Sequence, residues 1–363
     1  MTQQLDILII GGGISGLLTA QELRQAGREV TVIDQSAIGQ ESSWAGGGIL
    51  LPIYPWRQAA AISELVAVSL QIYPTLAQTL LKATGIDPEW TACGMLICKN
   101  PDIDAAQTWC DSYQIAHQTA PAELLKPLNS DFQQPIWLPG IAQARNPRLL
   151  KALQAYVLQQ GVKLLPNHAV TDIEISQQRI SRVHTNQNSF RANQVLLCAG
   201  AWSAKLLQQW LPSSGIELAI QPVRGQMLLF DAKPETLSYM VLDNAHYLIP
   251  RRDGKILAGS TVEHAGFDKV TTEDAKQQLY QFATDLLPEL KNHAVCQHWA
   301  GLRPGTPDGV PYIGWHPELE NLAINAGHFR NGLVMGPASA QLLADLILQR
   351  PTSVNPAAYA ITR

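Results

Sequence analysis

Three glycines, Gly11, Gly13 and Gly16, lie between an apolar run and a segment with helical spacing. This GxGxxG spacing suits a dinucleotide: Gly11 permits a tight turn, Gly13 lets the backbone approach a pyrophosphate, and Gly16 lets a helix pack closely on a strand. The N-terminus of that helix would offer its positive dipole end to the phosphates. Asp34 closes the next apolar run, 18 residues after Gly16, where its carboxylate would accept hydrogen bonds from ribose hydroxyls and repel a 2′-phosphate.

A second glycine-rich segment follows, Ser42–Pro52 (SSWAGGGILLP), with two hydroxyls before three glycines. Such a segment suits a loop that is pressed against a planar ring or a pyrophosphate, where side chains would collide. The alternative is a flexible surface loop. The apolar ILLP that ends the segment argues against that alternative, because flexible linkers rarely run into apolar segments.

The elements around the first motif form a strand–helix–strand pattern. Leu5–Ile10 is an apolar run apart from Asp6, as expected of a parallel strand that is covered on both faces. The apolar residues between 14 and 23 recur on one helical face, and Gly27 stands where a C-terminal cap belongs. Val30–Ile33 is a second, β-branched strand. The unit predicts a right-handed parallel crossover.

The rest of the chain alternates between two patterns. Residues 58–84 are helical, residues 85–140 carry short strands, turns and prolines, and a clear helix is expected at Arg148–Gln160. Strands are expected next at Lys163–Leu165, Ala169–Ile175 and Gln194–Leu197.

Residues 221–262 read instead as an antiparallel sheet. Its strands are expected at Gln226–Phe230, Tyr247–Pro250 and Ile256–Ser260, with a hairpin turn at Asp253-Gly254. A helix is expected from about residue 273 to 287, with Thr271 and Asp274 at the spacing of a capping box. The last expected helix lies near Pro337–Leu348.

This order of elements predicts a two-domain α/β (α+β) fold in which an antiparallel-sheet domain is inserted into a Rossmann-like dinucleotide-binding domain. The discontinuous binding domain comprises residues 1–84, 145–220 and 300–363. The substrate-binding domain comprises residues 85–144 and 221–299. A chain of 363 residues is long enough for two joined domains.

Composition excludes several classes of function. The net charge of −4 and the pI of about 6.1 give no reason to expect nucleic acid or an anionic membrane as a partner, so an anionic substrate would need locally placed cations. Residues 5–20 lack the basic flank and cleavage site of a signal peptide, and glycines interrupt them, so we expect neither a signal peptide nor a membrane span, and a cytoplasmic location. An odd cysteine count without CxxC argues against a disulfide framework, a zinc site or a dithiol redox pair, and predicts buried or half-buried thiols at Cys93, Cys98, Cys110, Cys198 and Cys296. We expect no metal site.

Together, these motifs resemble the D-amino-acid oxidase superfamily of FAD amine oxidases, and within it most of all the glycine oxidases of the thiamine-pathway type. The resemblance spans nearly the whole chain. The matching segments are GGGISG, SSWAGGGIL, CAGAWS (Cys198–Ser203), PVRGQML (Pro222–Leu228), HYLIPRRDG (His246–Gly254), WAGLRPGTPDGVPYIG (Trp299–Gly314) and AGHFRNGLVMGPAS (Ala326–Ser339).

The resemblance implies which residues bind cofactor and substrate. The residues expected to line FAD are Gly11, Gly13, Ile14, Ser15, Gly16, Asp34, Gln35, Ser42, Ser43, Gly47, Gly48, Ile49, Val170 at the adenosine end, and His328, Phe329, Arg330, Asn331, Gly332, Leu333 and Val334 around the isoalloxazine. The residues expected to face the substrate are Tyr247, Arg303 and Arg330.

The chemistry of the two arginines supports this assignment independently of the resemblance. A planar guanidinium binds a carboxylate through two hydrogen bonds, and an amino acid must be held with its Cα–H over the flavin. Arg303 lies in GLRPG and Arg330 in HFRNG, within segments expected to lie near the flavin. The alternatives are a structural ion pair for each arginine and an edge-strand aromatic for Tyr247.

Some positions depart from the family pattern. Asp34 stands where the family usually has the longer Glu, so the ribose contact can be rearranged, and Trp44 with its extra glycines changes the loop near the ring. The C-terminal flavin-wrapping segment has no cysteine of the kind that anchors FAD covalently in sarcosine oxidases, which implies non-covalent FAD. His246, His264 and His328 are candidate proton carriers, but hydride transfer from a neutral amine needs no dedicated protein acid or base.

The resemblance implies oxidation of glycine, sarcosine or small D-amino acids by molecular oxygen, with hydrogen peroxide and an imine that supplies thiazole synthesis as products. Three other functions stay open: a D-amino-acid dehydrogenase that reduces a quinone, a tRNA-modifying flavoprotein, and a flavin-binding scaffold or regulator without activity. The acidic pI argues against the tRNA enzyme, and a scaffold leaves the arginine pair without a purpose. The sequence leaves open whether the chain forms homo-oligomers.

Overall fold

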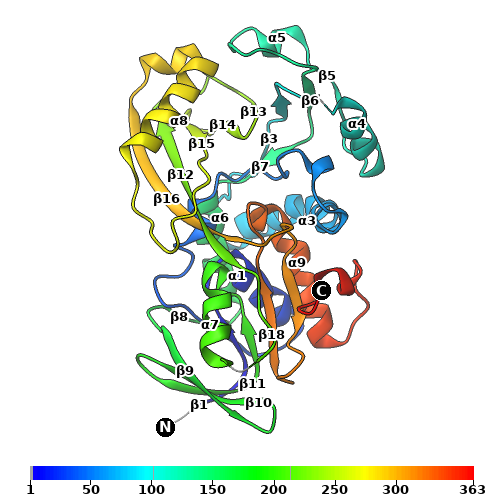
Figure 1. Cartoon of the computed structure of the whole chain (residues 1–363), viewed down its shortest axis with the longest axis vertical. Helices are drawn as coiled ribbons and strands as arrows, with labels where there is room; N and C mark the ends of the chain where they lie inside the picture. The colour runs from blue at the N-terminus through cyan, green and yellow to red at the C-terminus, as the bar shows by residue number, and fades with distance from the viewer. Residues whose placement is uncertain (1–2, 101, 213) are drawn as a thin grey trace.

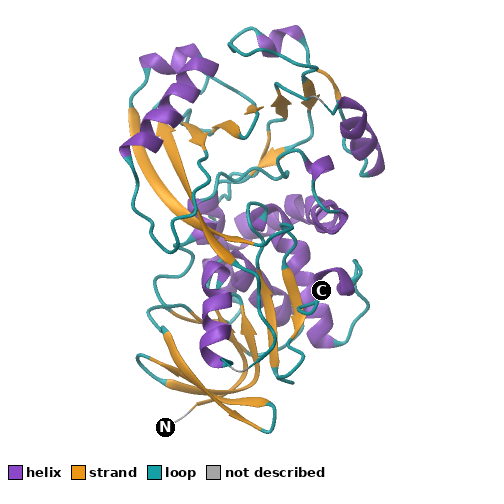
Figure 2. Ribbon diagram, viewed as in Figure 1, coloured by secondary structure: helices purple, strands orange, loops and turns teal. Residues whose placement is uncertain are grey.

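The computed structural model describes residues 3–100, 102–212 and 214–363. In this part of the chain, two eight-stranded sheets lie one above the other along the long axis of the molecule (Figure 1). Helices pack against both sheets (Figure 2). A separate two-stranded ladder joins β3 (Thr91–Ala92) to β7 (Ala142–Gln143). The mixed α/β fold with two sheets confirms the predicted fold class.

The first sheet is mainly parallel. Its order is β17 (Tyr312–Trp315), β18 (Leu322–Ala326), β11 (Ser189–Leu197), β1 (Gln3–Ile10), β2 (Val30–Ile33) and β8 (Lys163–Leu165). Only the pairing of β17 with β18 is antiparallel along this path. An antiparallel extension continues from β11 through β10 (Arg179–Thr185) to β9 (Val170–Ser176). The predicted parallel strand–helix–strand unit is therefore confirmed.

The second half of strand β1, Ile7–Ile10, is apolar because both of its faces are covered. Ile7 and Ile9 point into one core, whereas Leu8 and Ile10 point into another, as the two-residue repeat of a strand requires. The helices of the first core are α1 (Ile14–Gln25), α3 (Ala60–Thr84), α6 (Asn146–Gln159) and α9 (Gly332–Leu348), and α7 (Ser203–Trp210) contributes to the second.

Helix α3 is long and apolar enough, by length and composition, to cross a membrane. Its apolar side chains include Leu65, Val66 and Tyr73, which are buried in the first core. The Tyr73 hydroxyl also donates a hydrogen bond to the carbonyl of Leu333 in α9. Packing between helices therefore accounts for the apolar composition of α3.

The second sheet is antiparallel except for one pair. Its order is β16 (Val295–Gly305), β12 (Gln221–Phe230), β15 (Ile256–Gly259), β14 (His246–Pro250), β13 (Met240–Asp243), β4 (Met95–Ile97), β6 (Ile136–Leu138) and β5 (Gln118–Thr119), with β13 and β4 parallel. Helix α8 (Glu273–Leu286) packs on one face and α4 (Ile103–Ser112) on the other. The long strands β12 and β16 extend from this sheet toward the first one (Figure 1).

Helix α9 begins at Gly332, five residues before the predicted start at Pro337. A proline inside a helix removes the N–H that would bond the carbonyl four residues earlier, here that of Leu333. The Tyr73 hydroxyl donates a hydrogen bond to that carbonyl in place of the missing N–H. A contact from helix α3 thus lets α9 continue through Pro337, a residue that indicates a helix start when only the sequence is considered.

Other local expectations were also wrong. Residues 85–140 contain the expected short strands and also helix α4, which was not expected. The predicted loop after residue 41 begins with a short helix, α2 (Ser42–Ala45). The N-cap of α8 is Thr272, whose hydroxyl accepts from the Ala275 N–H, so Thr271 forms no capping box. Cys296 is exposed rather than buried. The domain boundaries given above remain a prediction.

Candidate functional site

A long cavity lies between the two sheets and is lined from both. The first sheet contributes the ends of β1, β2, β11 and β18, and the second contributes β12, β14 and β16. Of the residues expected to bind cofactor or substrate, those that line this cavity are Gly11, Gly13, Ile14, Ser15, Asp34, Gln35, Ser42, Ser43, Gly47, Gly48, Ile49, Val170, Tyr247, Arg303, His328, Phe329, Arg330, Gly332 and Leu333. Gly16, Asn331 and Val334 lie behind its wall.

Glycine stands at the three motif positions for different structural reasons. Gly11 has φ +111°, and a Cβ there would lie 2.3 Å from the carbonyl oxygen of Cys198. A Cβ on Gly16 would lie 1.9 Å from the carbonyl oxygen of Gly11. A Cβ on Gly13 would contact only the Ser43 Oγ, at 3.1 Å. Protein packing therefore requires glycine at 11 and 16, whereas Gly13 borders the cavity, where its lack of a side chain leaves room for a ligand.

The Asp34 carboxylate is tied to the glycine loop. Its Oδ2 accepts a hydrogen bond from the Gly12 N–H at 2.8 Å, and its Oδ1 accepts from the Ser36 N–H at 2.9 Å. Burial raises the pKa of this carboxyl, and the two backbone N–H donors oppose that rise. Asp34 therefore both fixes the loop and presents acceptor oxygens to the cavity that it lines.

We expect Asp34→Ala to weaken FAD retention, because each charge-assisted hydrogen bond to a ribose hydroxyl contributes about 1.5–3 kcal/mol. The apoprotein should still fold, since Asp34 lies beyond the end of β2 and outside the apolar core. Titration of apoprotein with FAD, followed by flavin fluorescence, measures the change. Unchanged affinity would show that another group binds the ribose.

The loop that follows residue 41 is held in place by helix α1 and by strand β16 of the second sheet. The Ser43 Oγ accepts a hydrogen bond from the Ile14 N–H at 2.9 Å, which caps the first turn of α1. The Ser42 hydroxyl donates to the carbonyl of Leu302 in β16 at 2.6 Å. Trp44 packs edge-on against Trp299, with ring centroids 5.8 Å apart. The tryptophan that departs from the family pattern thus belongs to a packed contact between α2 and β16.

Arg303 lies on β16 with its guanidinium flat against β12. Its Nη2 donates to the Ser260 Oγ at 2.7 Å, and its Nη1 donates to the carbonyls of Thr261 at 3.1 Å and Arg224 at 3.4 Å. A Cβ on Gly225 would come within 2.1 Å of this guanidinium, so only glycine leaves room for it. Arginine has five N–H donors, and these contacts leave two of them for a ligand.

The cavity has two cations without a carboxylate partner in the described residues. None of the ion pairs found there includes Arg303 or Arg330. The Arg330 Nη2 donates a hydrogen bond to the carbonyl of Ala245, at 3.4 Å. Burial lowers the pKa of Arg303, with Arg330 adding to the effect and the Tyr247 phenol opposing it. Burial likewise lowers the pKa of Arg330. Two desolvated guanidinium groups beside one phenol form a site suited to an anion.

The histidines do not form an acid–base pair in this cavity. Burial lowers the pKa of His328 to about 4, so its imidazole is neutral near pH 7, and its buried Nε2 has no hydrogen-bond partner among the described residues. Burial and then Arg330 lower the pKa of His246. His264 is exposed and does not line the cavity. A neutral, unpartnered imidazole beside the cavity fits contact with a cofactor.

Sequence reasoning missed several residues of the cavity. These include Glu41, Gly46, Asn146, His168, Cys198, Trp202, Gly225 and Met227. Asn146 donates from Nδ2 to the carbonyl of Ser43 at 2.6 Å, across 103 residues of sequence. The motifs SSWAGGGIL, CAGAWS and PVRGQML did contain Gly46, Cys198, Trp202, Gly225 and Met227, so the signal was present for those five.

A glycine loop with an acidic partner at one end and paired arginines at the other is the arrangement of a dinucleotide-dependent oxidoreductase. Residues 6–346 match the family model described as FAD dependent oxidoreductase (DAO). The chain is 43% identical over 361 residues to a glycine oxidase of Pseudomonas aeruginosa, covering 98% of each, and 31% identical to a bifunctional protein ThiO/ThiG of Synechocystis, covering 96% of this chain and 52% of that protein. The crystal structure of glycine oxidase from Geobacillus kaustophilus superimposes with a TM-score of 0.92 at 27% identity, covering 100% of this chain and 99% of that one.

The chain therefore belongs to the DAO family of FAD-dependent oxidoreductases, and its cofactor is FAD. The described residues fit this cofactor: the glycine loop and Asp34 line one part of the cavity, and the His328–Leu333 segment lines another. The free backbone space at Gly13 and the unpartnered Nε2 of His328 both face or adjoin this cavity.

Acid precipitation should release all of the yellow colour into the supernatant. All five cysteines are free, and of these only Cys198 lines the cavity, where burial raises the pKa of its thiol to about 12 and so opposes formation of a thiolate. Absorbance of pellet and supernatant checks this, and chromatography should identify the released flavin as FAD. Colour that stays in the pellet would contradict non-covalent binding.

Proposed function

We propose that this protein is an amino-acid oxidase that oxidises the C–N bond of glycine and of other small amino acids, such as sarcosine and small D-amino acids. The observation that carries the proposal is the pair of arginines, Arg303 and Arg330, which line the cavity beside Tyr247 without a carboxylate of the described chain to neutralise them. A substrate carboxylate would supply that missing charge. The similarity to glycine oxidases supports the choice of small amino acids.

The protein's own residues orient the substrate. Arg303 would hold the carboxylate through its two unused N–H groups, with Tyr247 and Arg330 on the same side of the cavity. FAD supplies a two-electron acceptor when bound. The substrate amine must arrive neutral, and no protein base is required, which agrees with a His328 that stays uncharged at neutral pH. Overall, the amino acid loses two electrons and two protons to become an imino acid, and molecular oxygen becomes hydrogen peroxide.

The same proposal covers the fate of the product and the place of the reaction. Some relatives are named bifunctional ThiO/ThiG proteins, and the match to this chain covers about half of their length. These relatives support delivery of the imine to thiazole synthesis for thiamine. Free thiols at the described cysteines agree with a cytoplasmic location. Within the chain, we assign the first sheet to a cofactor-binding domain and the second to a substrate-binding domain.

The decisive experiment adds glycine, sarcosine, D-alanine and D-proline without oxygen to the purified yellow protein, and follows bleaching of the flavin absorbance. We expect glycine to bleach it and air to restore it with release of hydrogen peroxide. Bleaching that air does not reverse, but that a quinone does, would replace the oxidase with a dehydrogenase. If none of the amines bleaches the flavin, the proposed function is wrong.

A further inference from the structure

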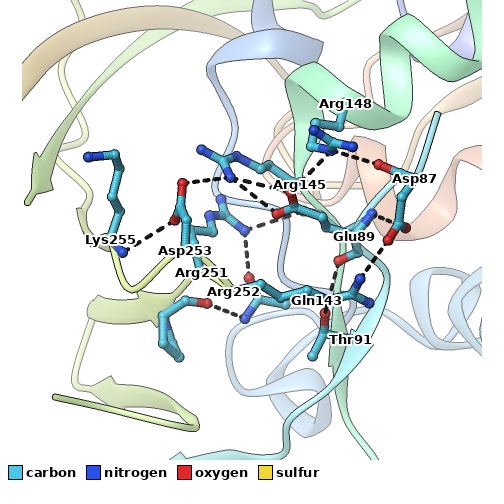
Figure 3. A network of polar contacts seen from close by, with 12 residues as sticks. Asp87, Glu89, Thr91, Gln143, Arg145, Arg148, Arg251, Arg252, Asp253 and Lys255 are labelled. Carbon is cyan, nitrogen blue, oxygen red and sulfur yellow. Dashed lines mark hydrogen bonds and ion pairs between the residues drawn. The ribbon is translucent and has the colours of Figure 1, made fainter. Parts of the chain in front are cut away.

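Arg251 is a buried cation behind the wall of the FAD cavity. It follows β14 directly and is only 8% exposed. Burial lowers its pKa to about 10, so the guanidinium stays charged at neutral pH. The surrounding carboxylates pair with other cations: Glu89 and Asp253 with Arg145, and Asp87 with Arg252 (Figure 3).

Neutral acceptors from two separate segments bind this guanidinium. Its Nη2 donates to the carbonyl oxygen of Gly47 at 2.7 Å. Its Nη1 donates to the Gln143 Oε1 at 2.5 Å (Figure 3). The carbonyl of Ala144 lies 3.5 Å from the same atom. Gly47 lines the FAD cavity, whereas Arg251 does not. The Gly47 carbonyl is therefore bound on the side of the loop that faces away from the cavity.

Strand β14 presses on the same glycine. A Cβ on Gly47 would lie 2.8 Å from the Cδ1 of Ile249 and 3.2 Å from the Cε2 of Tyr247. Residues 247, 249 and 251 are two apart and so share one face of the extended chain. Strand β14 thus carries the proposed substrate residue, Tyr247, and the residue directly after the strand is the cation that holds the cofactor loop against it.

The loop is also held by a short backbone ladder next to Arg251. The Ala144 N–H donates to the carbonyl of Gly48 at 2.9 Å, and the Leu50 N–H donates to the carbonyl of Ala142 at 3.0 Å. Neither bond reaches Gly47, whose carbonyl depends on Arg251. Without that side chain, the Gly47 peptide would be free to rotate its carbonyl toward the cavity.

We propose that Arg251 is a positioning residue that fixes the Gly47 peptide of the FAD-lining loop against the strand carrying Tyr247. The substrate half of this inference rests on the proposed function, whereas the cofactor half rests only on the FAD cavity. A guanidinium suits the task because its fixed fork donates to two segments at once, and a lysine would hold one of them.

The test compares Arg251→Met with Arg252→Met. The control removes the neighbouring positive charge, and Arg252 contacts Asp87, Thr91 and the Trp90 carbonyl rather than the loop. We expect Arg251→Met to raise the FAD dissociation constant of the apoprotein roughly tenfold to a hundredfold, the loss that follows from one hydrogen bond to a charged donor. It should also shift the visible bands of the bound flavin. Arg251→Lys should recover part of the affinity, and Arg252→Met should change neither quantity.

Stability is measured separately, because a buried substitution can weaken the fold. A role limited to stability would lower the melting temperature of the Arg251→Met apoprotein while its folded fraction bound FAD with the wild-type constant and spectrum; that result would overturn the inference. Gln143→Leu, which removes the partner that orients the guanidinium, should weaken FAD binding in the same direction by a smaller factor, and an unchanged constant there would also count against it. These readouts use no substrate, so they are independent of whether glycine bleaches the wild-type flavin.

Discussion

Arg303→Ala should lower kcat/KM for glycine by roughly 30-fold to several-thousand-fold and leave FAD content unchanged. Removing one partner of a desolvated charge pair costs on the order of 2–5 kcal/mol. A cost of ~1.4 kcal/mol corresponds to a tenfold change in kcat/KM. The guanidinium is half-buried, has no carboxylate partner in the described chain, and keeps two N–H groups unused. Steady-state oxygen consumption with glycine gives the ratio, and the absorbance of bound flavin gives the cofactor content.

Two further variants separate substrate binding from a structural role of Arg303. Arg303→Lys should recover only part of the activity, because an ammonium keeps the charge but loses the planar fork. Gly225→Ala should act in the same direction as Arg303→Ala, since its methyl group would displace the guanidinium that lies against it. An amine that lacks a carboxylate should lose less than glycine in the Arg303→Ala enzyme. Equal losses on both kinds of amine would leave Arg303 as a structural residue.

Gly16→Ala should abolish FAD retention and destabilise the apoprotein. Its methyl carbon would lie 1.9 Å from the carbonyl oxygen of Gly11, which is backbone and cannot swing aside, so the whole glycine loop must move. Overpacking of this kind costs about 1–3 kcal/mol, and more where backbone must shift. The FAD dissociation constant should rise roughly tenfold for every ~1.4 kcal/mol of binding free energy that is lost when the loop moves.

Gly13→Ala is the matched control for that result. Its methyl group would meet only the Ser43 Oγ, at 3.1 Å, so the melting temperature of the apoprotein should stay close to that of the wild type. FAD binding should nevertheless fall, because the new side chain would occupy space where the backbone must approach the pyrophosphate. If Gly13→Ala bound FAD normally, the pyrophosphate would have to lie elsewhere along the cavity.

The sequence predicts best what short-range patterns determine. The spacing of Gly11, Gly13 and Gly16 and the apolar runs of β1 and β2 reflect local packing rules, and the structure places these strands as expected. Helix α9 was misjudged at its start because the Pro337 signal is local, whereas the Tyr73 hydroxyl that compensates for it comes from another helix. Local pattern and tertiary contact disagree there, and the tertiary contact prevails.

The contacts that hold the residues of the site in place could not be predicted in the same way. Arg251 contacts Gly47 across 204 residues, and Arg303 contacts Ser260 across 43. Each contact exists only after the fold has brought distant segments together, so neither leaves a periodic signal in the sequence. The family resemblance identified the residues that face the cavity, and the structure adds those that hold them.

The central position of β1 also constrains how the chain is made. This strand pairs on one side with β2, which leaves the ribosome soon after it, but on the other side with β11, where Ile7 lies opposite Gln194. At a translation rate of about 5–20 residues per second, the edge of β1 that pairs with β11 stays unpaired for roughly 10–40 seconds during synthesis. An apolar, unpaired strand edge is a site of aggregation, so the nascent chain is most vulnerable while translation crosses the first half of the molecule, before residue 189 emerges.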